Sequence, residues 1–193
     1  QMCIRDRVKL GDRLAIMGPN GSGKTTLFKM LMGKEEGEGE FLFGTGVKIG
    51  YFNQELIVND EENTLVDEIS EDYPKMTITE IRTKLGAFLF RGDDVFKEMG
   101  DLSGGERARV SLLKLILSGA NVLFLDEPTN HLDIDSKEVL ESALDNFKGT
   151  IIFISHDRFF IRKLATKVLD LTHGKQKFFD GDYDYYISRV TDI

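Results

Sequence analysis

The feature that most constrains the fold is a glycine-rich segment at residues 18–25, with the letters GPNGSGKT. It matches the pattern G-x-x-x-x-G-K-[ST] and lies between a predicted buried strand, Arg13–Met17, and a predicted helix, Lys24–Met32. Glycines let successive backbone N–H groups point at one set of phosphate oxygens, and the following helix adds the positive end of its dipole. Strand, loop and helix in this order predict a phosphate-binding loop in an α/β domain. A glycine-rich turn beside a surface lysine is the alternative, which the flanking elements disfavour.

Strand and helix signals alternate along the rest of the chain, which predicts a mostly parallel sheet flanked by helices. Further strands are expected at Glu40–Phe43, Val47–Phe52, Val122–Leu125, Ile151–Ile154, Val168–Leu171 and Lys175–Phe179, the last two forming a hairpin that turns at His173-Gly174. Helices are expected over most of 63–90, from Ser103 onwards with Glu106 completing a capping box, at Ser136–Asn146 and at Asp157–Leu164. The prediction is one α/β domain with a mostly helical insertion.

Composition narrows the class of protein. A chain of 193 residues that is 41% apolar suits one globular domain with a real core. The single cysteine, Cys3, excludes a disulfide framework and a cysteine-based metal cluster. No run approaches the roughly 18 apolar residues of a membrane span, and the first residues do not read as a signal peptide. The net charge of −8 argues against bulk attraction to nucleic acid or anionic lipid. We therefore expect a soluble, cytoplasmic protein with no membrane domain in this chain.

Two acidic residues, Asp126 and Glu127, end the predicted buried strand that begins at Val122. Ligands of open α/β sheets bind at the carboxyl ends of the strands. Neighbouring side chains on a strand point differently, so Asp126 would hold Mg²⁺ through water while Glu127 polarises an attacking water as general base. Lys24 would reach the β- and γ-phosphates, and the Thr25 hydroxyl would ligate Mg²⁺. Two solvated acids at an exposed strand end are the alternative, and the nearby phosphate loop disfavours it.

Two further polar residues follow predicted strands and give weaker signals. Gln54 could reach the metal or the water, and His156 could donate a hydrogen bond to the γ-phosphate. An isolated histidine is more often a capping or packing residue. The position of His156 at the carboxyl edge of the sheet favours a place in the site.

Taken in order, the motifs resemble the nucleotide-binding domain of ATP-binding-cassette (ABC) proteins from about Lys9 onwards. They are the phosphate loop, Gln54, LSGGE at 102–106, LFLDEPTNHLD at 123–133 and ISHD at 154–157. The resemblance implies a P-loop NTPase fold with an α-helical signature subdomain at about 60–118 and a small β edge. It also implies that LSGGE binds the γ-phosphate of ATP held by a partner domain.

Residue by residue, the resemblance implies three kinds of role. Gln54, Glu127 and His156 would be catalytic, and Thr25, Gln54 and Asp126 would hold the metal. The residues that would bind ATP are Gly18, Pro19, Asn20, Gly21, Ser22, Gly23, Lys24, Thr25, Thr26, Ser103, Gly104, Gly105, Glu106 and Asp133. Ser103 and Gly105 would act across an interface.

Three further strings resemble the ABC-F subfamily: NHLD at 130–133, SHDRFF at 155–160 and GDYDYY at 181–186. The stretch from Ile81 to Asp93 is similar to the second cassette of such proteins. This resemblance implies ATP and Mg²⁺ as cofactors and ATP hydrolysis that closes and opens paired cassettes. It implies a second cassette and the ribosome as partners, with a role in translation or antibiotic resistance. The alternatives are the ATPase subunit of an ABC transporter and a domain that binds nucleotide without turnover.

Residues 1–7, QMCIRDR, depart from the family pattern. They contain no aromatic residue that could stack on adenine, and cassettes of this family start with strands further upstream. We therefore expect the domain to span 8–193, preceded by a non-family segment. Because such stacking contributes about 0.5–1.5 kcal/mol, weakened nucleotide affinity is expected.

Overall fold

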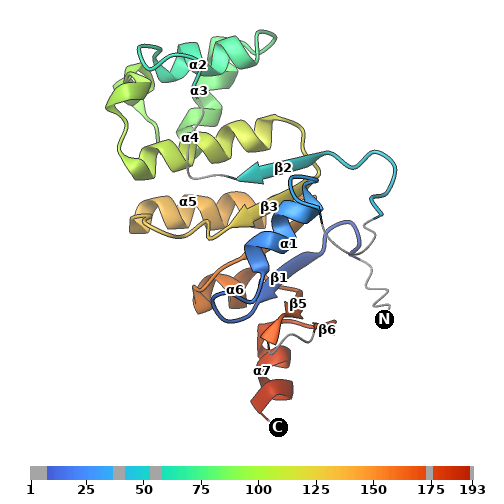
Figure 1. Cartoon of the computed structure of the whole chain (residues 1–193). Helices are drawn as coiled ribbons and strands as arrows, with labels where there is room; N and C mark the ends of the chain where they lie inside the picture. The colour runs from blue at the N-terminus through green and yellow to red at the C-terminus, as the bar shows by residue number, and fades with distance from the viewer. Residues whose placement is uncertain (1–7, 37–41, 53–57, 173–175, 192–193) are drawn as a thin grey trace. The chain divides into compact units, whose positions relative to one another are not determined.

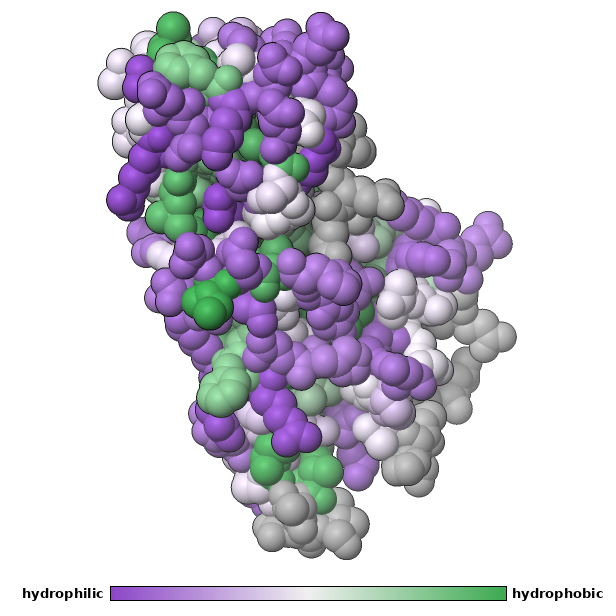
Figure 2. Space-filling model, turned by 90° about the vertical axis from the view of Figure 1, so that its left-hand side faces the viewer, coloured by the Kyte–Doolittle hydropathy of each residue, from purple (hydrophilic) through white to green (hydrophobic). Residues whose placement is uncertain are grey.

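The computed structural model describes residues 8–36, 42–52, 58–172 and 176–191 (Figure 1). The chain divides into two compact units. The first, which we call the sheet unit, comprises residues 1–51, 120–128 and 147–193. The second, the helical unit, comprises residues 52–119 and 129–146. On the face drawn in Figure 2, hydrophilic side chains predominate and hydrophobic areas are small and separate, as expected of a charged chain.

A six-stranded sheet organises the sheet unit, with the strand order β2-β3-β4-β1-β5-β6. The strands are β1 (Arg13–Met17), β2 (Ile49–Phe52), β3 (Val122–Asp126), β4 (Thr150–Ile154), β5 (Lys167–Asp170) and β6 (Lys177–Phe179). Parallel pairing joins β3 to β4, β4 to β1 and β1 to β5, whereas β6 runs antiparallel to β5. The strands β1, β3 and β4 consist mainly of apolar residues, as expected for parallel strands whose two faces are both covered.

Alternate side chains of these strands pack against helices on opposite faces. Helix α1 (Lys24–Leu31) covers one face, where the rings of Phe28 and Phe124 meet edge to face with centroids 5.2 Å apart. Helix α6 (Arg158–Leu164) covers the other face, where Phe160 meets Phe153 at 5.4 Å. The core therefore lies on both sides of β1, β3 and β4.

A C-terminal helix, α7 (Tyr183–Thr191), was not predicted from the sequence. The ring of Tyr186 packs edge-on against Phe179 of β6, with centroids 5.1 Å apart. Its hydroxyl donates to Oδ2 of the buried Asp170 at 3.2 Å. Burial and the negative charge of Asp170 raise the pKa of Tyr186 to about 12. This buried hydrogen bond ties α7 to the edge of the sheet.

Four α-helices and two short 3₁₀ helices form the described part of the helical unit. They are α2 (Leu65–Asp72), α3 (Ile78–Ala87), η1 (Gly92–Phe96), η2 (Met99–Asp101), α4 (Gly104–Leu117) and α5 (Ile134–Asp145). Side chains of the residues just before them accept backbone N–H bonds in the first turn: Thr64, Thr77, Ser103 and Asp133. Such caps satisfy donors that the helix itself leaves unpaired.

A buried carboxylate joins α2 to α4. The side chain of Glu68 is fully buried, and its Oε1 lies 2.6 Å from Nζ of Lys114. Asp72 also pairs with Lys114, at 2.8 Å. The backbone N–H of Asn59 donates to Glu68 at 3.0 Å, so the same carboxylate also fixes the segment before α2.

The expected elements differ from the observed ones in two places. The helical stretch 63–90 is broken between α2 and α3, where Pro74 lacks the N–H that a continuing helix needs. Residues 42 and 43 of the expected strand 40–43 lie in no strand, and residues 40 and 41 lie outside the described residues. Leu42 is 92% exposed, so its side chain gains no burial there. The expected hairpin forms, and its turn at His173-Gly174 lies outside the described residues, as does Lys175 of the expected strand 175–179.

Replacing Tyr186 with phenylalanine tests the anchor of α7. We expect Tyr186→Phe to lower the free energy of unfolding by about 1 kcal/mol at neutral pH, because one buried hydrogen bond is lost. Above pH 10 the unfolded phenol ionises first, so wild-type stability falls as the pH approaches about 12 and the difference between the proteins shrinks. Urea denaturation from pH 7 to 11 measures this, with the exposed Tyr185→Phe as control. A difference that stays constant up to pH 11 would contradict this explanation.

Removing the cation beside Glu68 tests the buried ion pair. We expect Lys114→Met to cost about 3–5 kcal/mol, because it leaves a buried carboxylate without its cation. The double variant Lys114→Met/Glu68→Leu should regain much of this loss. Lys29→Met, which breaks an exposed pair with Glu35, should change stability by less than about 1 kcal/mol. Equal costs for the two lysine variants in urea denaturation would show that burial does not matter here.

Candidate functional site

The phosphate-binding loop joins the carboxyl end of β1 to the start of α1. Gly18, Gly21 and Gly23 have φ angles of 151°, 79° and 89°, which side chains other than glycine rarely adopt. A Cβ at Gly18 would also lie 2.5 Å from Oγ of Ser22. The glycines predicted from the motif are therefore required by the shape of the loop.

Lys24 folds back into this loop. Its Nζ donates to the backbone oxygens of Gly18 at 2.8 Å and Pro19 at 3.0 Å, and the residue is 9% exposed. These bonds place a positive charge within the loop. An anion that enters the loop meets this ammonium group together with the backbone N–H groups at the start of α1.

Asp126, the last residue of β3, lies beside the first turn of α1. Burial raises the pKa of its carboxyl group above the usual value, whereas a hydrogen bond from Thr25 and the charge of Lys24 act in the opposite direction. A hydroxyl and a carboxylate are oxygen ligands of the kind that Mg²⁺ prefers. In the described part of the chain no group of three or more His, Cys, Asp or Glu residues could hold a metal ion. Mg²⁺ fits these two residues because it ordinarily completes its shell with water and substrate phosphates.

Glu127 and His156 contact each other at the same edge of the sheet. The backbone N–H of His156 donates to Oε2 of Glu127 at 3.1 Å, and Nε2 of His156 lies 3.3 Å from Oε1. Glu127 has a φ angle of 48°, a left-handed backbone conformation that is strained for residues other than glycine. Strained residues gather at functional sites, so this geometry supports the importance of Glu127.

A second cluster lies in the helical unit, at the start of α4. Ser103 and Glu106 form the predicted capping box. A Cβ at Gly105 would lie 2.7 Å from Oδ2 of Asp133 and 2.9 Å from Oγ of Ser136. The Oδ1 atom of Asp133 accepts the backbone N–H of Ser136 at 2.7 Å, and bonds from Ser136 lower the pKa of Asp133. The LSGGE turn and Asp133 are therefore in close contact within this unit.

The structure places the predicted site residues in two groups. The sheet unit brings together the loop from Gly18 to Thr26, Asp126, Glu127 and His156. The helical unit brings together Ser103, Gly104, Gly105, Glu106 and Asp133. Gln54 lies outside the described residues.

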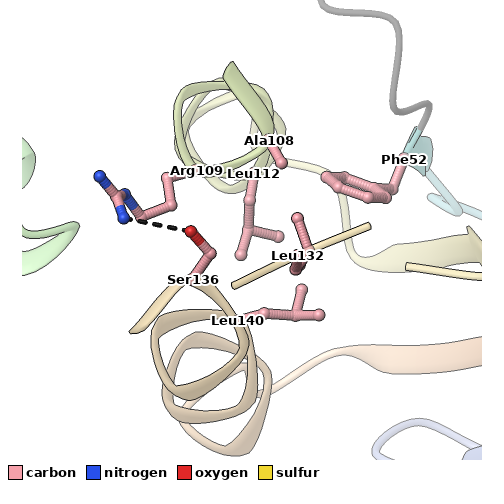
Figure 3. A pocket seen from close by; sticks show the side chains of 7 residues that line it. All are labelled: Phe52, Ala108, Arg109, Leu112, Leu132, Ser136 and Leu140. Atoms are coloured by element: carbon pink, nitrogen blue, oxygen red, sulfur yellow. Dashed lines mark hydrogen bonds between the residues drawn. The ribbon is translucent and has the colours of Figure 1, made fainter. Parts of the chain in front are cut away.

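Sequence reasoning missed Arg109 and Tyr51. Nη1 of Arg109 donates to Oγ of Ser136 at 3.1 Å (Figure 3). Its guanidinium also lies 5.0 Å from the ring centroid of Phe90. Tyr51 lies near Asp126, since burial and the charge of Asp126 raise the pKa of its phenol. The available signals were an arginine one turn before the buried Leu112 and an aromatic residue in the strand before Gln54.

A small cavity borders Arg109 and Ser136 (Figure 3). Its volume of about 10 Å³ suffices for about one water molecule. The other lining side chains are apolar: Phe52, Ala108, Leu112, Leu132 and Leu140. This cavity is a packing gap beside the second cluster and is too small for a nucleotide.

A methyl group at Gly105 tests the contact with Asp133. We expect Gly105→Ala to lower the free energy of unfolding by about 1–3 kcal/mol, because Asp133 is held by its bond to Ser136 and must move. Gly104→Ala is the matched control, since its Cβ would meet nothing within 4 Å. Urea denaturation compares the two. Equal stability would mean that the Gly105 contact has no energetic weight.

None of the helices in the described residues has the length and apolar character of a membrane span.

The family model described as "ABC transporter" matches residues 4–130. A solved structure of the RNase-L Inhibitor aligns with a TM-score of 0.69 at 25% sequence identity, covering 96% of this chain and 38% of that one. These findings confirm the predicted P-loop NTPase fold.

Curated relatives narrow the assignment. The Bacillus subtilis (strain 168) protein YdiF is 49% identical over 183 residues, which are 94% of this chain and 28% of YdiF. The energy-dependent translational throttle protein EttA of Escherichia coli (strain K12) is 43% identical over 182 residues, covering 91% of this chain and 33% of EttA. ABC transporter F family member 2 of Arabidopsis thaliana is 39% identical over 185 residues, covering 94% of this chain and 27% of that protein. The chain thus spans 27–33% of the length of these relatives. The matched motifs, the fold and these relatives show that the chain belongs to the ABC transporter family, as an ABC ATPase domain of the ABC-F type.

Proposed function

We propose that this domain binds Mg-ATP at the loop of the sheet unit and hydrolyses it, and that bound ATP closes two cassettes against each other. The observation that supports this most directly is the grouping of the ammonium of Lys24 with three acid–base side chains at one sheet edge. Those side chains belong to Asp126, Glu127 and His156. Together they supply what phosphoryl transfer to water needs: charge neutralisation, a base and a donor.

The loop residues bind the phosphates in this proposal. Nζ of Lys24 exchanges the carbonyl oxygens of Gly18 and Pro19 for phosphate oxygens, so a bond lost within the loop is replaced by one to the ligand. Thr25 and Asp126, with Gln54, hold Mg²⁺, which when bound neutralises phosphate charge. The backbone N–H groups at the start of α1 bind the remaining oxygens.

Glu127 and His156 act on the γ-phosphate. Glu127 accepts a proton from water as the water oxygen attacks the γ-phosphorus, and the bond from that phosphorus to ADP breaks. His156 donates a hydrogen bond to a γ-phosphate oxygen. Because both carboxylate oxygens of Glu127 contact His156, the histidine also keeps the base in place.

The second cluster serves the nucleotide of another cassette. Ser103 caps α4, whose N-terminal end attracts anions and begins with Gly104, Gly105 and Glu106, and Asp133 lies against Gly105. The second cassette is either another part of a longer protein or a second copy of this chain. Each ATP would then contact both halves and stabilise only the closed state.

We further propose that the full-length protein acts on the ribosome in the cytoplasm as a translation or antibiotic-resistance factor. The support is the 43% identity to EttA, which is named a translational throttle protein. Sedimentation of the full-length Glu127→Gln protein with ribosomes, with and without ATP, tests this role. Co-purification with a membrane permease instead would favour a transporter ATPase.

Glu127→Gln tests the proposed base. We expect turnover to fall at least about 100-fold, the ordinary contribution of a general base, while ATP binding persists. Light scattering should show a dimer with Mg-ATP and a monomer without it, because hydrolysis no longer reopens the closed state. An unchanged turnover rate would contradict the role of Glu127.

A further inference from the structure

Glu106 occupies two hydrogen-bond donors of Ser103, a residue that the proposed function assigns to the nucleotide of another cassette. Its Oε2 accepts both the backbone N–H of Ser103 and the Ser103 hydroxyl, each at 2.9 Å. Its Oε1 accepts from Nζ of Lys97 at 2.9 Å. The carboxylate therefore lies between the signature serine and a lysine of the preceding segment.

This carboxylate is an anion at neutral pH. Partial burial acts to raise its pKa, but the bonds from Ser103 and Lys97 prevail and lower it. A phosphate that approaches Ser103 is also negatively charged and needs the same hydrogen-bond donors as the carboxylate of Glu106. Two anions cannot share those donors without strong repulsion, so one must leave.

We propose that Glu106 does not bind ATP, contrary to what the resemblance implies, but is an internal competitor for the phosphate that Ser103 binds, and that Lys97 holds the carboxylate after the phosphate displaces it. This inference rests on the proposed function of Ser103. Lys97 is then a positioning residue: it also pairs with Asp94 at 3.0 Å, which fixes it beside α4. The competition sets how much ATP is needed before two cassettes close.

A capping box also stabilises a helix start without any competition. The two interpretations predict opposite effects of neutralising Glu106 on the closure of two cassettes. If Glu106 only caps α4, then weakening either of its side-chain bonds should make closure harder. If Glu106 competes with phosphate, its neutralisation should make closure easier, whereas loss of Lys97 should make closure harder because the displaced carboxylate has no cation.

The test measures the Mg-ATP concentration at which half of the protein is dimeric, by light scattering in the Glu127→Gln background. We expect Glu106→Gln to lower this concentration about fivefold, because a neutral amide binds the Ser103 donors more weakly than a carboxylate. We expect Lys97→Met to raise it about threefold. Thermal unfolding of each variant verifies that the fold persists.

Arg107→Met is the matched control. It breaks an ion pair with Glu61, at 2.7 Å, one residue further along α4, and leaves the side-chain bonds between Ser103 and Glu106 in place. Its half-maximal ATP concentration should match that of the parent. If the Glu127→Gln protein without further substitutions stays monomeric at every ATP concentration, two copies of this chain do not pair, and the inference is overturned for this chain. If the Glu127→Gln protein does form a dimer, but Glu106→Gln leaves its ATP requirement unchanged or raises it, the inference about Glu106 is overturned while the pairing of cassettes stands.

Discussion

Parallel hydrogen bonding among β1, β3 and β4 is the constraint on which the catalytic group depends. The register pairs Ile154 with Ile16 of β1 on one side and with Asp126 of β3 on the other. The three strands therefore end at one level, and the loops that follow carry Gly18, Glu127 and His156 to the same edge. The backbone N–H of Glu127 also donates to the oxygen of Ile154 at 2.9 Å, which extends this ladder into the site. A shift of one strand by one residue would separate the acid–base groups from the loop.

Electrostatic cost marks the same edge. Burial raises the pKa of Asp126, because its ionised carboxylate loses part of its solvation at this edge of the sheet. Glu127 adopts a left-handed backbone conformation beside it. Both features work against stability and become useful only when a cation and a phosphate arrive. The helical unit has a similar feature, because the carboxylate of Glu106 lies at the start of α4, where the proposed ligand would bind.

Local patterns predicted part of this structure well. Strand β1 has the predicted bounds, and Ser103 caps α4 with Glu106 as expected, because both depend on residues adjacent in sequence. Helix α7 was missed because the buried hydrogen bond that anchors it, from Tyr186 to Asp170, spans 16 residues of sequence. Arg109 was missed for the same reason: its partner Ser136 lies 27 residues away in sequence. The roles of the candidate site residues remain predictions, although their grouping follows from the sheet register.

The central claim is that the loop of one cassette and the LSGGE turn of another serve one nucleotide. Mixing two inactive variants of this chain, Lys24→Ala and Ser103→Arg, measures this most directly through ATP turnover. Each variant alone should be inactive, whereas a mixed dimer contains one site with both Lys24 and Ser103 intact. We expect turnover to reappear on mixing, up to about a quarter of the wild-type rate if the subunits pair at random. Full turnover by Ser103→Arg alone, or no recovery in a mixture shown to contain mixed dimers, would contradict the account.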